Sequence, residues 1–315
     1  MQENMIRDVV MVGAGPSALA AAIYTTRENI DTVLYEKGVV GGLAAITDKV
    51  DNYPGFPDGI EGMQLAEQLQ KQAERFGAHI EYGDVSALRD EGTHRVVTVD
   101  GHEVSARAVL IATGSDYNKL GIPGEAEYYG RGVHYCATCD GAFYRDKRIV
   151  VVGGGNSGVQ EAIFLTRFAS HIDLLVRSTI KASDVLQREL QKYVDAGQVT
   201  IHLQTSPLAI VANDEGRVST VTILNRDEHG EIATDGVFVF IGLKPNTQFL
   251  AGSGVELDER NLIKTDTHLA TSLTGVFASG DVRSGATMQV ASAVGEGATA
   301  ALSIREFLDG QKIEA

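Results

Sequence analysis

The chain's only two cysteines, Cys136 and Cys139, are separated by two residues and followed directly by Asp140. Two thiols at this spacing can form a reversible, easily reduced disulfide, and a short helix after the first thiol would lower its pKa. A neighbouring carboxyl group can relay the proton that lets one sulfur leave as a thiol. The segment therefore predicts a redox dithiol with Asp140 as its proton relay.

Two other interpretations of the cysteine pair stay open. A zinc site needs four ligands, and beyond the two cysteines only His134 is near in sequence, so remote histidines would have to complete it. Two reduced, inert thiols are the second interpretation, but it leaves the spacing of the chain's only cysteines unexplained. The reversible dithiol is preferred.

A second candidate site lies near the amino terminus, where the apolar run 8–12 ends in a glycine motif, Gly13-Ala14-Gly15-Pro16-Ser17-Ala18. A helix is expected over 19–28 and a second strand over 32–36, which closes a βαβ unit. Such glycines let backbone N–H groups approach a pyrophosphate at the positive end of a helix. Glu36 follows Gly15 by about 20 residues, the spacing at which a carboxylate accepts both hydroxyls of an adenosine ribose. An adenine dinucleotide without a 2′-phosphate is predicted here.

The same pattern returns later in the chain. A strand over 148–152 leads into Gly153-Gly154-Gly155-Asn156-Ser157-Gly158, then a helix over 159–168 and a strand over 172–176. The position equivalent to Glu36 is Val176, which cannot bind ribose hydroxyls, but Arg177 and then Lys181 follow it. These cations can pair with a 2′-phosphate, which favours NADP over NAD mildly. The other interpretation is that Arg177 is an ordinary surface charge.

The repeat also predicts the domain organisation. Each copy continues into β-rich sequence and then into a strand ending in glycine, at Gly114 and at Gly242. A further strand over 275–281 has no counterpart in the second copy, so the second unit is predicted to be inserted into the first. We expect an α/β fold of two Rossmann-like dinucleotide-binding domains, each with a small β-meander. The outer domain would comprise 1–117 and 246–315, and the inserted domain 118–245. The crossings, near 117–119 and 244–246, suit a hinge.

Length and charge narrow the class of protein. A chain of 315 residues suggests about two domains. The net charge of −15 disfavours nucleic acid and anionic lipid as partners. The first eight residues carry acids where a signal peptide carries bases, and no apolar run is long enough to span a membrane, so we expect a cytoplasmic protein. Two dinucleotide sites and one dithiol together predict an electron path from nicotinamide through flavin to the disulfide.

Over nearly its whole length the sequence resembles the low-molecular-weight thioredoxin reductases. Besides the first glycine motif, the matching segments are Tyr35-Glu36-Lys37 with Gly41-Gly42, Asp51-Asn52-Tyr53-Pro54-Gly55, Ala112-Thr113-Gly114, Cys136-Ala137-Thr138-Cys139-Asp140-Gly141 and Gly280-Asp281-Val282-Arg283. The resemblance implies FAD in the outer domain, a homodimer, and electron transfer to thioredoxin or a thioredoxin-like protein. It also implies that Cys139 faces the flavin, Cys136 attacks the partner's disulfide, Asp140 is acid and base, and the inserted domain rotates between two poses.

The candidate cofactor-binding residues follow from the motifs and the resemblance together. For FAD they are Gly13, Gly15, Pro16, Ser17, Ala18, Glu36, Lys37, Gly42, Leu43, Asn52, Thr113, Gly114, Asp281, Gln289 and Val290. For NADPH or NADH they are Gly153, Gly155, Asn156, Ser157, Gly158, Arg177, Lys181 and Gly242.

Several residues depart from the family pattern. The second glycine motif usually continues with Asp-Ser-Ala, not Asn156-Ser157-Gly158, and the phosphate-reading His-Arg-Arg is here 176–178, Val-Arg-Ser. Leu43 replaces a common glutamine, Met288 a common arginine, and His134 a small polar residue. The same dithiol flavoenzyme with ferredoxin or another donor, or one acting as a dithiol oxidase, therefore remains an alternative. A redox-sensing flavoprotein is the alternative from another class.

Overall fold

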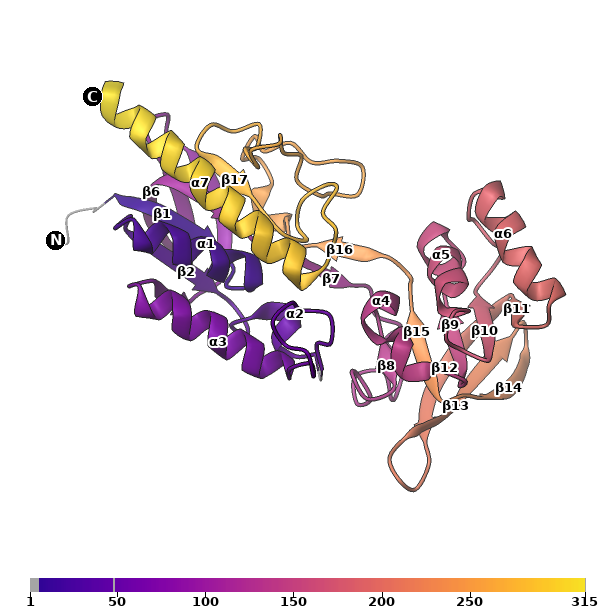
Figure 1. Ribbon diagram of the computed structural model, residues 1–315. Helices are drawn as coiled ribbons and strands as arrows, with labels where there is room; N and C mark the ends of the chain where they lie inside the picture. Colours follow the sequence, from indigo (N-terminus) through magenta and orange to yellow (C-terminus); the bar gives the residue numbers. More distant parts are fainter. Residues whose placement is uncertain (1–5, 48, 315) are drawn as a thin grey trace. The chain divides into compact units, whose positions relative to one another are not determined.

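The computed structural model describes residues 6–47 and 49–314. The chain divides into two units, Met1–Asp116 with Lys244–Ala315, and Tyr117–Leu243 (Figure 1). The chain therefore passes between the units twice, so the second unit is an insertion in the first.

The first unit is built on a seven-stranded sheet in the order β3-β2-β1-β6-β5-β4, with β17 also paired to β6. Its strands are β1 (Arg7–Val12), β2 (Thr32–Glu36), β3 (His79–Tyr82), β4 (Val85–Asp90), β5 (Arg95–Val99), β6 (His102–Ile111) and β17 (Val276–Ala278). The long strand β6 pairs antiparallel with β5 over its first half and parallel with β17 over its second half. The meander β4-β5-β6 is thus continuous with the parallel sheet.

Strand β1 shows how this sheet is covered, because its side chains alternate between two cores. Val9 and Met11 pack with residues of α1 (Pro16–Arg27), α3 (Gly62–Arg75) and α7 (Val290–Glu314). Val10 and Val12 pack on the opposite face with residues of β4, β5 and the segment 250–282. Both faces are buried, which explains the unbroken apolar run in the sequence.

The second unit has a five-stranded sheet in the order β11-β10-β9-β15-β8 and a separate three-stranded antiparallel sheet, β12-β13-β14. The strands are β8 (Val133–His134), β9 (Arg148–Val152), β10 (His171–Val176), β11 (Val199–Leu203), β12 (Thr205–Ala212), β13 (Val218–Asn225), β14 (Glu228–Ala233) and β15 (Gly236–Val239). Ile149 and Val151 face α5 (Asn156–Leu165) and α6 (Asp184–Asp195), whereas Val150 and Val152 face the three-stranded sheet β12-β13-β14.

The prediction that the strand near 275–281 has no counterpart in the second copy is wrong. In the first unit β17 pairs parallel to β6, and in the second unit β8 pairs parallel to β15 in the equivalent position. Strand β8 precedes its glycine motif in the chain, whereas β17 follows the first motif, so a comparison in sequence order could not align them.

The two segments that join the units, β7 (Ser115–Tyr117) and β16 (Leu243–Pro245), pair with each other as a two-stranded sheet. The remaining short elements are α2 (Gly42–Ala45), α4 (Ala137–Asp140) and the 3₁₀ helices η1 (Gly141–Tyr144) and η2 (Gln248–Leu250). Among the residues that the structure describes, no helix is long and apolar enough to cross a bilayer.

Candidate active site

The first glycine motif forms the turn between β1 and α1. Gly13 has a φ of +97°, and a Cβ there would lie 2.6 Å from the Ala112 carbonyl oxygen, so a side chain is excluded by the backbone itself. Gly15 caps α1, which begins with Pro16 and has no side-chain cap, and a Cβ at Gly15 would meet nothing within 4 Å. The helix therefore presents unpaired N–H groups, those of Ser17 and Ala18 among them, beside open space, as a bound pyrophosphate requires.

A cavity of about 330 Å³ lies beside this turn, entirely within the first unit. It is lined by Val12, Gly13, Tyr35, Glu36, Lys37, Gly83, Asp84, Val85, Ser86, Thr113, Asn246, Gln248 and Phe249. The Glu36 carboxylate is fixed by N–H donors from Ala14 and Gly38, each at 2.8 Å. Each carboxylate oxygen keeps acceptor capacity for a hydroxyl donor, so cavity and turn together fit the adenosine and pyrophosphate of FAD.

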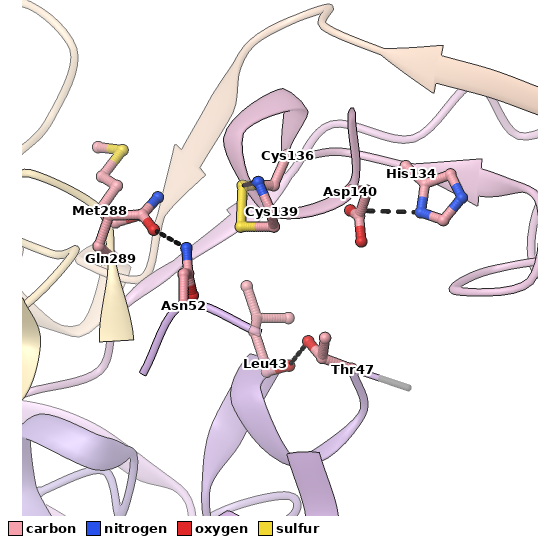
Figure 2. The surroundings of a disulfide bond; sticks show 9 residues. All are labelled: Leu43, Thr47, Asn52, His134, Cys136, Cys139, Asp140, Met288 and Gln289. Carbon is pink, nitrogen blue, oxygen red and sulfur yellow. Dashed lines mark hydrogen bonds and ion pairs between the residues drawn. A yellow bond between two sulfur atoms is a disulfide. The ribbon is translucent and has the colours of Figure 1, made fainter. Parts of the chain in front are cut away.

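The other predicted flavin-site residues also belong to the first unit. Asn52 donates a hydrogen bond to the Gln289 side chain at 3.0 Å, and the Leu43 carbonyl in α2 accepts one from Thr47 (Figure 2). Thr113 exchanges hydrogen bonds with Asn246, joining the loops after β6 and β16. Gly42 lies at the start of α2 beside Leu43, Gly114 has a positive φ at the end of the loop after β6, and Val290 begins α7.

Asp281 follows β17 on the loop Gly280-Asp281. Its carboxyl group makes no hydrogen bond with any residue that the structure describes. Burial, and then the charge of Glu296, raise its pKa to about 6. A partly buried carboxyl group without a donor fits a ligand that brings its own hydroxyl groups, as the ribityl chain of FAD does.

Sequence reasoning missed Glu296, which holds this loop in place. Its carboxylate accepts hydrogen bonds from the Gly280 N–H at 2.8 Å and from two guanidinium nitrogens of Arg283 at 2.7 and 2.6 Å. The residue lies within α7, away from every recognised motif, so only the tertiary contact identifies it.

The two glycines of the first turn give a testable contrast. Gly15→Ala is expected to fold normally, because its methyl group enters open space, yet to weaken FAD binding at least about tenfold by filling the place of the pyrophosphate. Gly13→Ala is expected to lower the thermal midpoint instead, since its Cβ meets a backbone oxygen. Flavin content after reconstitution and thermal unfolding measure the two effects. Unchanged FAD affinity in Gly15→Ala would contradict the proposed pyrophosphate position.

The second glycine motif forms the equivalent turn between β9 and α5. A Cβ at Gly153 would lie 2.4 Å from the Phe240 carbonyl oxygen, and one at Gly158 would lie 2.4 Å from the Gly153 carbonyl oxygen. Gly155 again caps the helix with open space at its Cβ position, and no side chain caps α5. This turn is therefore also shaped to receive a pyrophosphate, with the exposed Ser157 beside it.

The remaining predicted nicotinamide-site residues lie at the same edge of the second unit's sheet. Arg177 follows β10, and the side chains of Arg177 and Lys181 are exposed and make no hydrogen bond or ion pair with the described residues, whereas the Lys181 N–H donates to the Gly154 carbonyl at 2.7 Å. Asn156 is engaged within the protein, accepting a hydrogen bond from the Ser183 N–H at 2.8 Å. Gly242, with a φ of +107°, lies in the loop after β15. Two cationic side chains without a partner therefore lie on the same edge as the uncapped helix.

The redox pair belongs to the second unit, ahead of β9. Cys136 and Cys139 form a disulfide, and Cys136 is the N-cap of α4, its Sγ accepting the Cys139 N–H at 3.1 Å. Asp140 follows at the end of α4, and its Oδ2 lies 3.2 Å from Nδ1 of His134 (Figure 2). Because both sulfurs are bonded to each other, neither is a metal ligand in this state.

Comparison with known proteins identifies the family. Residues 7–297 match the model of the pyridine nucleotide-disulphide oxidoreductases. The chain belongs to this family. The thioredoxin reductase of Bacillus subtilis is 39% identical over 98% of this chain and 97% of its own length, and that of Treponema pallidum is 38% identical over 96% and 97%. The crystal structure of thioredoxin reductase from Streptococcus pyogenes, 36% identical, aligns with a TM-score of 0.92 over 98% of this chain and 100% of its own.

These matches confirm the resemblance to the thioredoxin reductases and the α/β fold of two Rossmann-like domains. Members of the pyridine nucleotide-disulphide oxidoreductase family use FAD and a nicotinamide nucleotide, and the turns, the cavity and Asp281 fit such ligands. The close pair Cys136 and Cys139, bonded as a disulfide, fits the redox-active disulfide of a disulphide oxidoreductase.

Proposed function

We propose that this chain is a thioredoxin reductase, which passes electrons from NADPH through FAD and the Cys136–Cys139 disulfide to the disulfide of thioredoxin or a thioredoxin-like protein. The observation that carries the proposal is the disulfide beside Asp140, in a unit with its own dinucleotide turn inserted into a second such unit. The test is NADPH oxidation by the FAD-loaded chain. It should be slow alone and fast when oxidised thioredoxin is added.

In this proposal each glycine turn binds one pyrophosphate through the N–H groups of its helix, and Glu36 binds the ribose of FAD. FAD, when bound, supplies a carrier that accepts two electrons and passes them on. Asn52, Gln289 and Asp281 orient the flavin end of the cofactor. The paired strands β7 and β16 serve as the hinge on which the inserted unit rotates.

The dithiol chemistry is a pair of thiol–disulfide exchanges. Reduction of the enzyme disulfide takes up two electrons and two protons and gives two thiols. Cys136 gives up its proton and, as its thiolate, attacks the thioredoxin disulfide to form a mixed disulfide; the first thioredoxin sulfur is released and takes up that proton. Cys139 then attacks the Cys136 sulfur, which re-forms the enzyme disulfide and releases the second thioredoxin sulfur. Asp140 takes the Cys139 proton and returns it to the departing sulfur.

We propose NADPH as the preferred donor because the side-chain charges of Arg177 and Lys181 have no partner among the described residues beside the second turn. Arg177→Ala should weaken NADPH binding by about 1–3 kcal/mol and leave NADH binding nearly unchanged, since only NADPH carries the 2′-phosphate. Stopped-flow bleaching of the flavin with each nucleotide measures this, with Arg167→Ala, which lies beyond the opposite end of α5, as the control. If Arg177→Ala weakened NADPH and NADH binding equally, or if neither nucleotide bleached the flavin of the unmodified chain, NADPH would not be the preferred donor.

A homodimer and a cytoplasmic location complete the proposal. Tyr24 on α1 and Leu302 on α7 are exposed large apolar side chains on two helices that pack together, and a second copy would cover them. Regeneration of the dithiol needs a supply of reduced nicotinamide nucleotide, which the cytoplasm provides. Light scattering of the FAD-loaded protein measures the mass of the assembly.

A further inference from the structure

Asp140 is the outer end of a buried chain of polar side chains in the second unit. His134 Nδ1 lies 3.2 Å from Asp140 Oδ2, and His134 Nε2 lies 2.7 Å from the Tyr144 hydroxyl. His134 is 5% exposed, and its ring packs against Tyr144 and Phe238 with centroid distances of 5.2 and 5.1 Å. Both ring nitrogens therefore have one polar partner each, in a site otherwise walled by aromatic rings.

Gly236 leaves the space that the Tyr144 ring occupies beside His134. A Cβ on Gly236, at the start of β15, would lie 2.2 Å from a ring carbon of Tyr144. Glycine at this position thus allows the Tyr144 ring to lie where its hydroxyl reaches His134. Tyr144 packs edge-on against Phe238 as well, at 5.2 Å. The rings fix the imidazole orientation, so the Asp140 contact has little freedom to change.

The proton on His134 can be assigned from its partners. Burial, and then the charges of Asp140 and Asp235, raise the pKa of Tyr144, so its phenol keeps its proton at neutral pH. That hydroxyl can donate to Nε2, which leaves the proton of a neutral imidazole on Nδ1, where it donates to Asp140. Two other titratable groups lie near Asp140, His134 and Tyr144. One is Tyr129, whose pKa is raised by burial and by the Asp140 charge; the other is Asp235, which Lys147 contacts at 3.7 Å.

We propose that His134 is a positioning residue for the dithiol reaction: it holds Oδ2 of Asp140 through Nδ1–H and leaves Oδ1 to exchange the proton with Cys139. This inference rests on the proposed thioredoxin reductase function and deepens it. In the second exchange Cys139 loses its proton to Asp140 as its sulfur bonds to Cys136, and Asp140 gives that proton to the thioredoxin sulfur that leaves. His134 gains and loses no net proton.

The test uses substitutions that separate the two ring nitrogens, in the FAD-loaded full chain. His134→Asn keeps an N–H donor near the position of Nδ1, whereas His134→Gln moves its amide to the position of Nε2 and leaves Asp140 without a donor. Thioredoxin reduction in His134→Gln should fall about tenfold or more. Because an N–H donor favours a charged carboxylate, the limb of its pH–rate profile that belongs to Asp140 should move to higher pH. His134→Asn should recover most of the rate and the wild-type profile.

Two further measurements keep the result interpretable. The thermal midpoint reports on folding, and flavin reduction by NADPH reports on the half-reaction in which Asp140 takes no part. Both should be similar in His134→Gln and His134→Asn. Tyr144→Phe keeps the ring and loses only the hydroxyl, so its profile should shift in the same direction as that of His134→Gln, by less. The rate of alkylation of the reduced dithiol by iodoacetamide, followed against pH, should show the same order of variants without any nucleotide.

The inference is overturned if His134→Gln keeps the wild-type pH profile, or if the Gln and Asn variants lose rate equally with no change of profile. Those results would leave thioredoxin reduction by the unmodified chain intact. A wild-type chain that fails to reduce thioredoxin would instead contradict the proposed function itself.

Discussion

Replacing Cys139 with Ser is expected to lower thioredoxin reduction by at least about 10³-fold while FAD stays bound. A serine hydroxyl cannot form the disulfide that stores the electrons, and Cys136→Ser should have the same effect for the same reason. Cys139 is in α4 of the second unit, whereas the proposed FAD site belongs to the first, so flavin content should not change. NADPH oxidation coupled to thioredoxin measures the loss.

Thr138→Ser is the matched control for this experiment. It places a serine between the two cysteines, on the exposed side of α4, and leaves both sulfurs in place. Its turnover should stay within about twofold of the unmodified chain. Retained turnover in both cysteine variants would refute the dithiol mechanism.

Asp173→Ala is expected to destabilise the second unit by about 1–3 kcal/mol, the effect of removing a buried acceptor whose donors are themselves partly exposed. The Asp173 side chain is 1% exposed in the centre of β10 and accepts hydrogen bonds from Arg148 Nε and His202 Nε2, each at 2.8 Å. Its removal leaves these donors without their acceptor. Denaturant unfolding of the full chain measures the change. Asp214→Ala, in an exposed turn, should change stability by less than about 0.5 kcal/mol.

The same residue should contribute to acid sensitivity. Burial alone would raise the pKa of Asp173, but the hydrogen bonds from His202 and Arg148 and the charges of Arg148 and His171 outweigh it and lower the pKa. A depressed carboxyl pKa contributes stability above its unfolded value, near 4, and this contribution is lost as the pH falls below it. Asp173→Asn should therefore lose less stability than the unmodified chain between about pH 5 and pH 2. Parallel stability curves would show that Asp173 is not responsible.

Local spacing predicted the parts of the site that depend on neighbouring residues. The positions of Gly15, Gly155 and Glu36 are set by a strand, a turn and the next strand, so a βαβ pattern is enough to predict where they lie. The Cys136–Cys139 bridge follows from a spacing of the same kind.

Contacts between distant segments were not predictable in this way. Glu296 is recognised only because α7 brings it to the Gly280 N–H, and β8 is too short to recognise as a strand without β15 beside it. His134 is visible in the sequence only as a departure from the family pattern, because the role proposed for it depends on the Tyr144 ring and on the missing side chain of Gly236. These features depend on which distant segments pack together, and the spacing of apolar residues along the sequence does not give that information.

The most direct test of the account is an anaerobic reductive titration of the FAD-loaded chain, with thiols counted at the end. We expect uptake of about four electrons per chain, two for the flavin and two for the disulfide, with both cysteines recovered as thiols. The Cys139→Ser variant should take up about two. Uptake of about two electrons by the unmodified chain, with the Cys136–Cys139 disulfide still intact, would contradict it, as would a chain that binds no flavin.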